Sequence, residues 1–123
     1  MTSTFKFILG SVVALVALAA GPAAAQDMRF MSDTPYVHFT KDDKAMFRKA
    51  MMESLDRAAD GETKTWSNPT SGAGGEIKVL KSYEAKSQKC RTLAIANKAK
   101  ARSNAGEYNF CAKAGKWTLS NAQ

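Results

Sequence analysis

The two cysteines carry the chemistry that the sequence constrains most tightly. Cys90 and Cys111 are the only cysteines in the 123 residues, and their spacing differs from the Cys-x-x-Cys motif of most redox pairs. An even number of cysteines in a small exported chain favours a structural disulfide instead. A bridge that closes a loop of about 22 residues adds about 3 kcal/mol to the free energy of unfolding. We therefore predict a structural disulfide between Cys90 and Cys111.

Basic residues form the second chemically distinctive set. The chain has 18 Lys and Arg against 11 Asp and Glu, a formal charge of +7. Residues 26–61 are close to neutral, whereas residues 62–123 hold 11 basic and 4 acidic residues. A solvated basic face without a specific partner is one interpretation, and a surface for anions is the other. For the second interpretation, the candidate anion-binding patch comprises Lys78, Lys81, Lys86, Lys89, Arg91, Lys98, Lys100 and Arg102.

The remaining polar groups offer little for catalysis. His38 is the only histidine, no serine lies in a Gly-x-Ser-x-Gly motif, and the glycines of residues 72–75 lack the Lys-Ser/Thr ending of a phosphate-binding loop. Met28, Met31 and His38 together could bind a cuprous ion, although methionines more often fill gaps in a core. We predict no catalytic residue, no metal site and no cofactor.

The N-terminus has the layout of an export signal. Lys6 precedes an apolar run over residues 7–20, a Gly-Pro pair follows, and the alanines of 23–25 offer a cleavage site. The run is shorter than the roughly 20 residues of a membrane-spanning helix, which disfavours an N-terminal anchor. We predict a signal peptide over 1–25 and a periplasmic mature chain of 98 residues without a transmembrane segment. Export also argues against nucleic acid as a partner.

The mature chain begins with a segment that has no helical periodicity and contains a proline, so we expect residues 26–40 to be an extended lead-in. Thr40 and Asp43 then match a capping box, which marks the start of a helix. Apolar residues at steps of three and four predict an amphipathic helix over 41–60, closed by Gly61.

Alternation of apolar and polar residues replaces the helical period after Gly61. A glycine-rich turn is expected at 69–75, and Ile77, Val79 and Tyr83 are expected on one face of the strand that follows. The predicted strands are 62–68, 76–86, 89–97, 107–113 and 116–120. We therefore predict a single α+β domain over 41–123, in which one N-terminal amphipathic helix packs on an antiparallel sheet of four to five strands.

The cysteines also predict the pairing of two strands. If Cys90 faces Cys111 in an antiparallel pair, Leu93 faces Tyr108 on the opposite side of the sheet. The apolar side chains then share the core face, and the disulfide lies on the other face. A slip of one residue would remove that agreement.

The same register places Arg91 on the core face opposite Phe110. An unpaired buried charge is costly, so the arginine needs a partner. One interpretation pairs its guanidinium with Glu53 or Asp56 of the helix, and the other makes it an anion-binding group.

A set of short motifs follows in a fixed order along the mature chain: Gly61, Trp66-Ser67-Asn68-Pro69, Gly72, Gly74-Gly75, Cys90-Arg91, Cys111 and Gly115-Lys116-Trp117. In this order, over residues 42–120, they resemble the C-terminal domain of the seventeen-kilodalton surface antigen family of bacterial envelopes. The lipid-attachment cysteine and glycine-rich membrane segment of the rickettsial members are missing, and Ala112 replaces a frequent arginine. The resemblance implies the fold and the cellular compartment. It implies no catalytic activity, because none is established for the family.

Charge, export signal and resemblance lead to one expected function. We expect an exported, non-enzymatic protein of the cell envelope, periplasmic or associated with the outer membrane, which binds anionic envelope components through a cationic sheet face. The alternative is a periplasmic accessory or inhibitor subunit that docks on an envelope protein through Trp66 and the lead-in. A small hydrolase that uses Arg91 is a third hypothesis.

Overall fold

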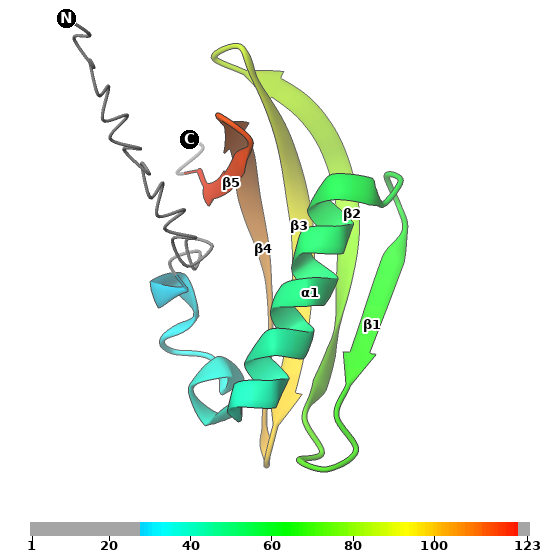
Figure 1. Cartoon of the computed structure of the whole chain (residues 1–123), viewed down its shortest axis with the longest axis vertical. Coiled ribbons are helices and arrows are strands. Elements are labelled where there is room, and N and C mark those ends of the chain that lie inside the picture. Colours follow the sequence, from blue (N-terminus) through cyan, green and yellow to red (C-terminus); the bar gives the residue numbers. More distant parts are fainter. Residues whose placement is uncertain (1–27, 121–123) are drawn as a thin grey trace, which may run out of the picture.

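A helix packed on one face of an antiparallel sheet makes up the fold, as Figure 1 shows. The structure, a computed structural model, describes residues 28–120, and the predicted signal peptide lies outside these residues. The described elements are the 3-10 helices η1 (Arg29–Met31) and η2 (Pro35–His38), the helix α1 (Lys41–Arg57), and the strands β1 (Thr63–Ser67), β2 (Gly74–Ala85), β3 (Gln88–Ala99), β4 (Arg102–Lys113) and β5 (Lys116–Leu119). The predicted α+β class is confirmed.

Helix α1 begins as predicted and ends earlier than predicted. The Asp43 amide donates to Thr40 Oγ1 at 3.1 Å, and Asp43 Oδ2 accepts the Thr40 amide at 2.9 Å, which completes the capping box. The prediction that the helix extends to residue 60 is wrong, because Ala58 already has extended backbone angles. Gly61, with φ of +86°, instead lies in the turn that leads into β1.

The five strands of residues 28–120 lie in sequence order across the sheet, β1-β2-β3-β4-β5, and each pairs antiparallel with the next. Three hairpins with two-residue turns therefore connect β2 to β5. Strand β4 begins at Arg102 rather than at 107, because backbone pairing with β3 continues through small and polar residues that show no alternation. We call the end of the sheet with the β2–β3 and β4–β5 turns the distal end, and the end with the β3–β4 turn the proximal end.

The register predicted for β3 and β4 is confirmed. Cys90 pairs with Cys111 and Leu93 with Tyr108, and the two cysteines form a disulfide. The prediction for Tyr83 is wrong, because a β-bulge between Val79 and Lys81 shifts the alternation of β2. Tyr83 consequently pairs with Cys90 on the face opposite Ile77 and Val79.

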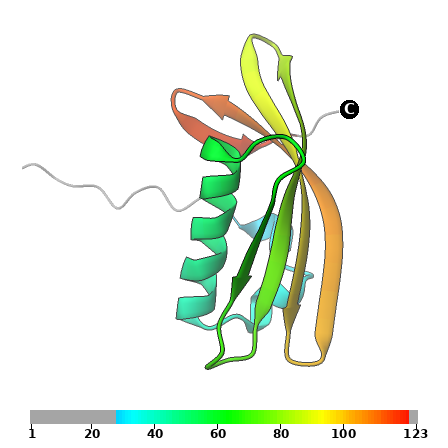
Figure 2. The same ribbon diagram turned by 90° about the vertical axis from the view of Figure 1, so that its right-hand side faces the viewer.

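Helix α1 and the two 3-10 helices all lie on the same side of the sheet (Figure 2). We call this side the inner face and the opposite side the outer face. The core between the layers is apolar, and it includes Phe47, Met51, Leu55, Ile77, Val79, Leu93 and Phe110. Because none of the described elements covers the outer face, its side chains decide what the sheet presents to its surroundings.

The prediction of an extended lead-in is wrong. Residues 29–38 form two 3-10 helices, and Thr34 caps the second by accepting the Tyr36 amide at 3.3 Å. Met31 is 1% exposed within the core, and the Phe30 ring lies 5.1 Å from the Tyr108 ring. Burial of these apolar side chains stabilises the folded segment, although its sequence shows no helical periodicity.

Candidate functional site

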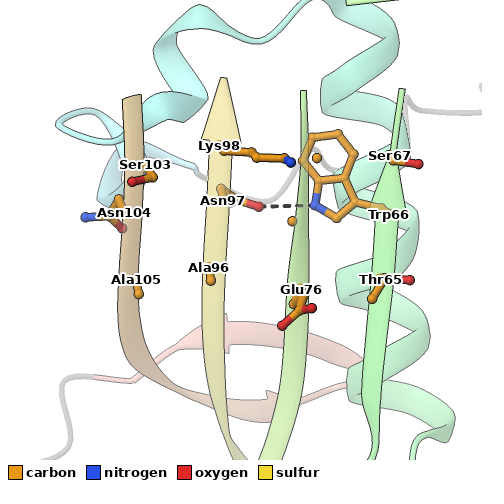
Figure 3. Close-up of a pocket in the computed structure, with 12 residues that line it drawn as sticks. Thr65, Trp66, Ser67, Glu76, Ala96, Asn97, Lys98, Ser103, Asn104 and Ala105 are labelled. Atoms are coloured by element: carbon orange, nitrogen blue, oxygen red, sulfur yellow. Dashed lines mark hydrogen bonds between the residues drawn. The ribbon is translucent and has the colours of Figure 1, made fainter. Parts of the chain in front are cut away.

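Trp66, the residue expected to dock on a partner, is buried in the structure. Its side chain is 7% exposed, and its ring lies 5.0 Å from the ring of Phe39. Figure 3 shows the indole extending from β1 across β2, where its Nε1–H donates to Asn97 Oδ1 at 3.1 Å. A Cβ at Gly75 would collide with that oxygen, so glycine is needed beneath the indole. The prediction of Trp66 as a docking residue is therefore wrong.

The Asn68-Pro69 turn is held by the helix N-terminus. Asp43 Oδ1 accepts a hydrogen bond from Asn68 Nδ2 at 2.8 Å and another from Ser71 Oγ at 2.6 Å. Burial acts to raise the pKa of Asp43, but the hydrogen bonds from Ser71, the Thr40 amide and Asn68 outweigh it and lower the pKa below its usual value. The carboxylate thus joins the helix cap to the connection between β1 and β2.

Arg91 is bound entirely within the protein. Its Nη1 donates to the carbonyl oxygens of Ser54 at 2.8 Å and Leu55 at 3.1 Å, and its Nη2 donates to that of Ala58 at 2.5 Å. Neither helix residue that we predicted as its partner is used. Glu53 lies 3.7 Å from Lys64 Nζ, and Asp56 accepts from the Trp117 indole.

The two remaining donors of the guanidinium are also occupied. Arg91 Nε donates to Ser82 Oγ at 2.9 Å, and Nη2 contacts Asp60 Oδ1 at 3.2 Å. Hydrogen bonds from Ser82 and Arg91 lower the pKa of Asp60. Since a guanidinium has five N–H groups, none is left for an external anion. Including Arg91 in the anion-binding patch is therefore wrong; it satisfies the carbonyl groups at the C-terminal end of α1.

The other seven basic residues of the predicted patch do not gather in one place. Lys86 and Lys89 lie at the distal end, whereas Lys98, Lys100 and Arg102 lie around the proximal β3–β4 turn. Nine residues of extended strand separate Lys89 from Lys98, a distance of about 30 Å. That is well beyond the Debye length of about 8 Å at physiological salt, so the two groups act independently.

The structure adds two lysines to the distal group that sequence reasoning missed. Lys113 and Lys116 flank the Ala114-Gly115 turn and face each other directly across the β4–β5 hairpin. A lysine on each side of a two-residue turn is the sequence signal that identifies such a pair. Strand parity places both on the outer face with Lys81 and Tyr83, where Lys81 Nζ lies 5.4 Å from the Tyr83 ring.

We call Lys81, Lys86, Lys113 and Lys116 the distal lysine cluster; Lys89 is left out because it lies on the inner face, where it pairs with Glu84 across the β2–β3 hairpin. All four are exposed, and none forms an ion pair with any residue among 28–120. On the outer face of the described strands, the region between Lys81 and the distal turns contains the disulfide. No Asp or Glu of these strands has its side chain in that region. Opposed like charges destabilise a hairpin, so the Lys113–Lys116 pair is an arrangement that an anion would relieve.

The proximal half of the outer face is different in charge and shape. A groove of about 650 Å³ crosses β1 to β4 there, and small side chains such as Ala96, Ser103 and Ala105 form its floor. Lys98 extends from β3 toward β2 in Figure 3, and Glu76 lies in the same groove. On the strands of this half, acidic residues accompany the basic ones, since Lys78 and Lys98 share the outer face with Glu76 and Glu107.

Met28 and Met31, two of the three residues considered as copper ligands, contribute to the packing of the core. Met31 is buried in the core, where its sulfur accepts from Thr34 Oγ1 at 3.6 Å, and Met28 packs against the same core. Over residues 28–120 no group of three or more His, Cys, Asp or Glu side chains is placed to hold a metal ion.

None of the helices in the described part of the chain is long and apolar enough to cross a membrane. The chain matches no protein-family model, no curated protein and no solved structure. The resemblance to the surface antigen family therefore rests on the motifs alone. In the structure, Trp66, Asn68, Gly75, Arg91 and the cysteines of those motifs all hold the fold together.

Proposed function

We propose that the chain is an exported, non-catalytic domain of the cell envelope, similar to the surface antigen family, that binds anionic envelope components through the distal lysine cluster. One observation carries this proposal: four exposed lysines, two of them directly opposed, share one end of the sheet without an acidic partner among the described residues. The predicted export signal and the resemblance to an envelope family support this compartment. Lipid phosphates, lipopolysaccharide and acidic cell-wall polymers are the anions found there.

Geometry favours the distal cluster over the whole basic half of the chain. The β2–β3 and β4–β5 hairpins extend from the distal end in diverging directions (Figure 2), which leaves both turns open to an anionic surface. Each lysine near an anionic lipid surface contributes about 1 kcal/mol of binding free energy. The cluster can therefore support reversible, salt-sensitive attachment without a pocket.

Two variants of equal charge test the location of the site. Lys81, Lys113 and Lys116 are replaced by Gln in one, and Lys98, Lys100 and Arg102 are replaced by Gln in the other. Both lose three positive charges, so any difference reports position. Pelleting with envelope fractions, and with vesicles that contain anionic phospholipid, is measured at low and high salt.

We expect the distal variant to bind about a hundredfold more weakly than the unmodified chain, while the proximal variant stays close to it. Equal losses of binding in both variants would mean that binding depends only on net charge, and they would overturn the proposed site. Recovery of the unmodified chain in the soluble fraction at every salt concentration would overturn the function itself. Salt-independent co-purification of one stoichiometric protein would favour the accessory-subunit alternative.

A further inference from the structure

Among residues 28–120, the sheet has a free edge along half of β4. Strand β5 pairs only with residues 110–113 of β4, and beyond them the Ser120 amide donates to the Asn109 carbonyl at 2.7 Å. The backbone groups of a strand alternate in direction, so those of Ser103, Ala105 and Glu107 also point away from β3. No backbone group among residues 28–120 pairs with these three residues.

Among the described residues, this edge has few of the features that usually prevent strands from pairing with another chain, and Glu107 is the only charged side chain of residues 103–107. Strand β1, at the other edge, has five residues, carries Lys64 and is followed closely by Pro69. The exposed stretch of β4 over residues 103–107 has no proline, no lysine and no bulge. Proteins use short strands, edge lysines and prolines to block unwanted pairing, and their absence leaves a template for a further strand.

We propose that a second copy of this chain pairs with this edge, antiparallel, with Ala105 opposite Ala105. Ser103 of each copy then lies opposite Glu107 of the other. Among the antiparallel registers, this one uses all three outward residues of both copies, and it forms six backbone hydrogen bonds. The result is a continuous sheet of ten strands.

Charge complementarity supports the same register. Lys98 of β3 neighbours Ser103 on the outer face, so Glu107 of the second copy lies one strand farther along the same row. Their Cα atoms are then about 10 Å apart, the sum of two cross-strand distances. Because the intervening Ser103 is small, the long side chains of Lys98 and Glu107 can meet above it, and the two-fold symmetry makes the contact twice.

The pairing has a consequence for binding, although it does not depend on the proposed function. A two-fold axis between antiparallel edge strands is perpendicular to the sheet, so both outer faces lie on the same side of the dimer. The two distal lysine clusters then lie on the same side of the dimer, at its opposite ends. Simultaneous attachment of both would raise the apparent affinity without any new contact.

Proline substitutions on the two edges of the sheet test this dimer. Ala105 and Thr65 belong to the same cross-strand row, at opposite edges, and both direct their backbone away from the sheet. Proline at either position removes an amide hydrogen that the fold does not use. The mass of the purified chain is measured by sedimentation equilibrium over a range of concentrations, together with that of A105P and T65P.

We expect the unmodified chain and T65P to form dimers, and A105P to associate about thirtyfold more weakly, because the dimer loses two hydrogen bonds. A single-chain mass for the unmodified protein at all concentrations would overturn the proposal. Equal association of A105P and T65P would also overturn it. A monomeric A105P that still pellets with envelope fractions would separate this inference from the proposed function.

Cysteine substitution gives a second measurement that does not depend on proline being tolerated. The native cysteines are joined to each other, so A105C and T65C each add one free thiol. Under mild oxidation we expect A105C to form a covalent dimer and T65C to remain a single chain. Comparable crosslinking of both would contradict the register. Reversal of one charge, by K98E or E107K, should weaken association, and the double variant should restore it.

Discussion

Replacing Arg91 by alanine removes the group that satisfies the C-terminal carbonyls of α1. Three carbonyl hydrogen bonds are lost, and each contributes about 1 kcal/mol net to the free energy of unfolding. Loss of the positive charge at the helix C-terminus adds a few tenths of a kcal/mol. The Asp60 contact is assigned nothing, because its carboxylate is 55% exposed. We therefore expect R91A to lower the free energy of unfolding by about 3 kcal/mol.

Such a loss is large for a domain of this size. Small domains have free energies of unfolding of about 5–15 kcal/mol, and 1 kcal/mol shifts the midpoint of thermal unfolding by about 4–8 °C. R91A should thus melt about 12–24 °C below the unmodified chain. R91K keeps the charge but has a single ammonium, which can reach one or two of the carbonyls, so we expect about half the loss.

The assay is urea unfolding at neutral pH with the disulfide intact, followed by fluorescence of the two tryptophans. R102A is the matched control, since it removes an exposed arginine at the proximal end and should stay within about 0.5 kcal/mol. An R91A variant as stable as R102A would refute the structural role. It would then restore the earlier interpretation of Arg91 as an anion-binding group.

Three further predictions concern the disulfide, the indole contact and the acid stability. Replacing both Cys90 and Cys111 by alanine should lower the free energy of unfolding by about 3 kcal/mol, and addition of reductant should then no longer change the urea midpoint. Replacing Gly75 by alanine should lower it by more than about 2 kcal/mol, because the added carbon collides with Asn97 Oδ1 and the Ala96 carbonyl; a midpoint equal to that of the unmodified chain would contradict the packing in Figure 3. The lowered pKa of Asp43 means that its stabilisation is fully present above the unfolded value, near 3.8, and is lost as the pH falls through the folded value. The stability difference between the unmodified chain and D43N should therefore be largest near neutral pH and shrink below about pH 4; a constant difference in urea titrations from pH 7 to 2 would count against it.

Patterns that are local in the chain predicted the architecture well. The capping residues Thr40 and Asp43 act within one helical turn, so the start of α1 could be read directly. The pairing of β3 with β4 followed from parity, because side chains alternate between faces and Cys90 and Cys111 had to meet. Both inferences depend on spacing alone, which the sequence contains.

The candidate site could be predicted only in part. Lysine counts showed that the second half of the chain is basic. They could not show that long strands separate the basic residues into two sets at opposite ends of the sheet. Lys113 and Lys116 joined the distal lysine cluster only because the β4–β5 hairpin lies at the same end as the β2–β3 turn. Position along a folded sheet depends on how the hairpins align, and composition does not encode it.

By itself the sequence determined the helix cap, the disulfide, the strand register and the excess of positive charge, because each follows from residue type and local spacing. Only the tertiary structure decided what Arg91 and Trp66 do. Their partners, Ser54 and Asn97, lie 37 and 31 residues away in the chain. Asn97 meets Trp66 because β1 and β3 lie on either side of β2, and Ser54 meets Arg91 because α1 packs on the sheet. The same packing drew residues 29–38 into the core, since burial of Phe30 and Met31 outweighs the weak local preference of that segment.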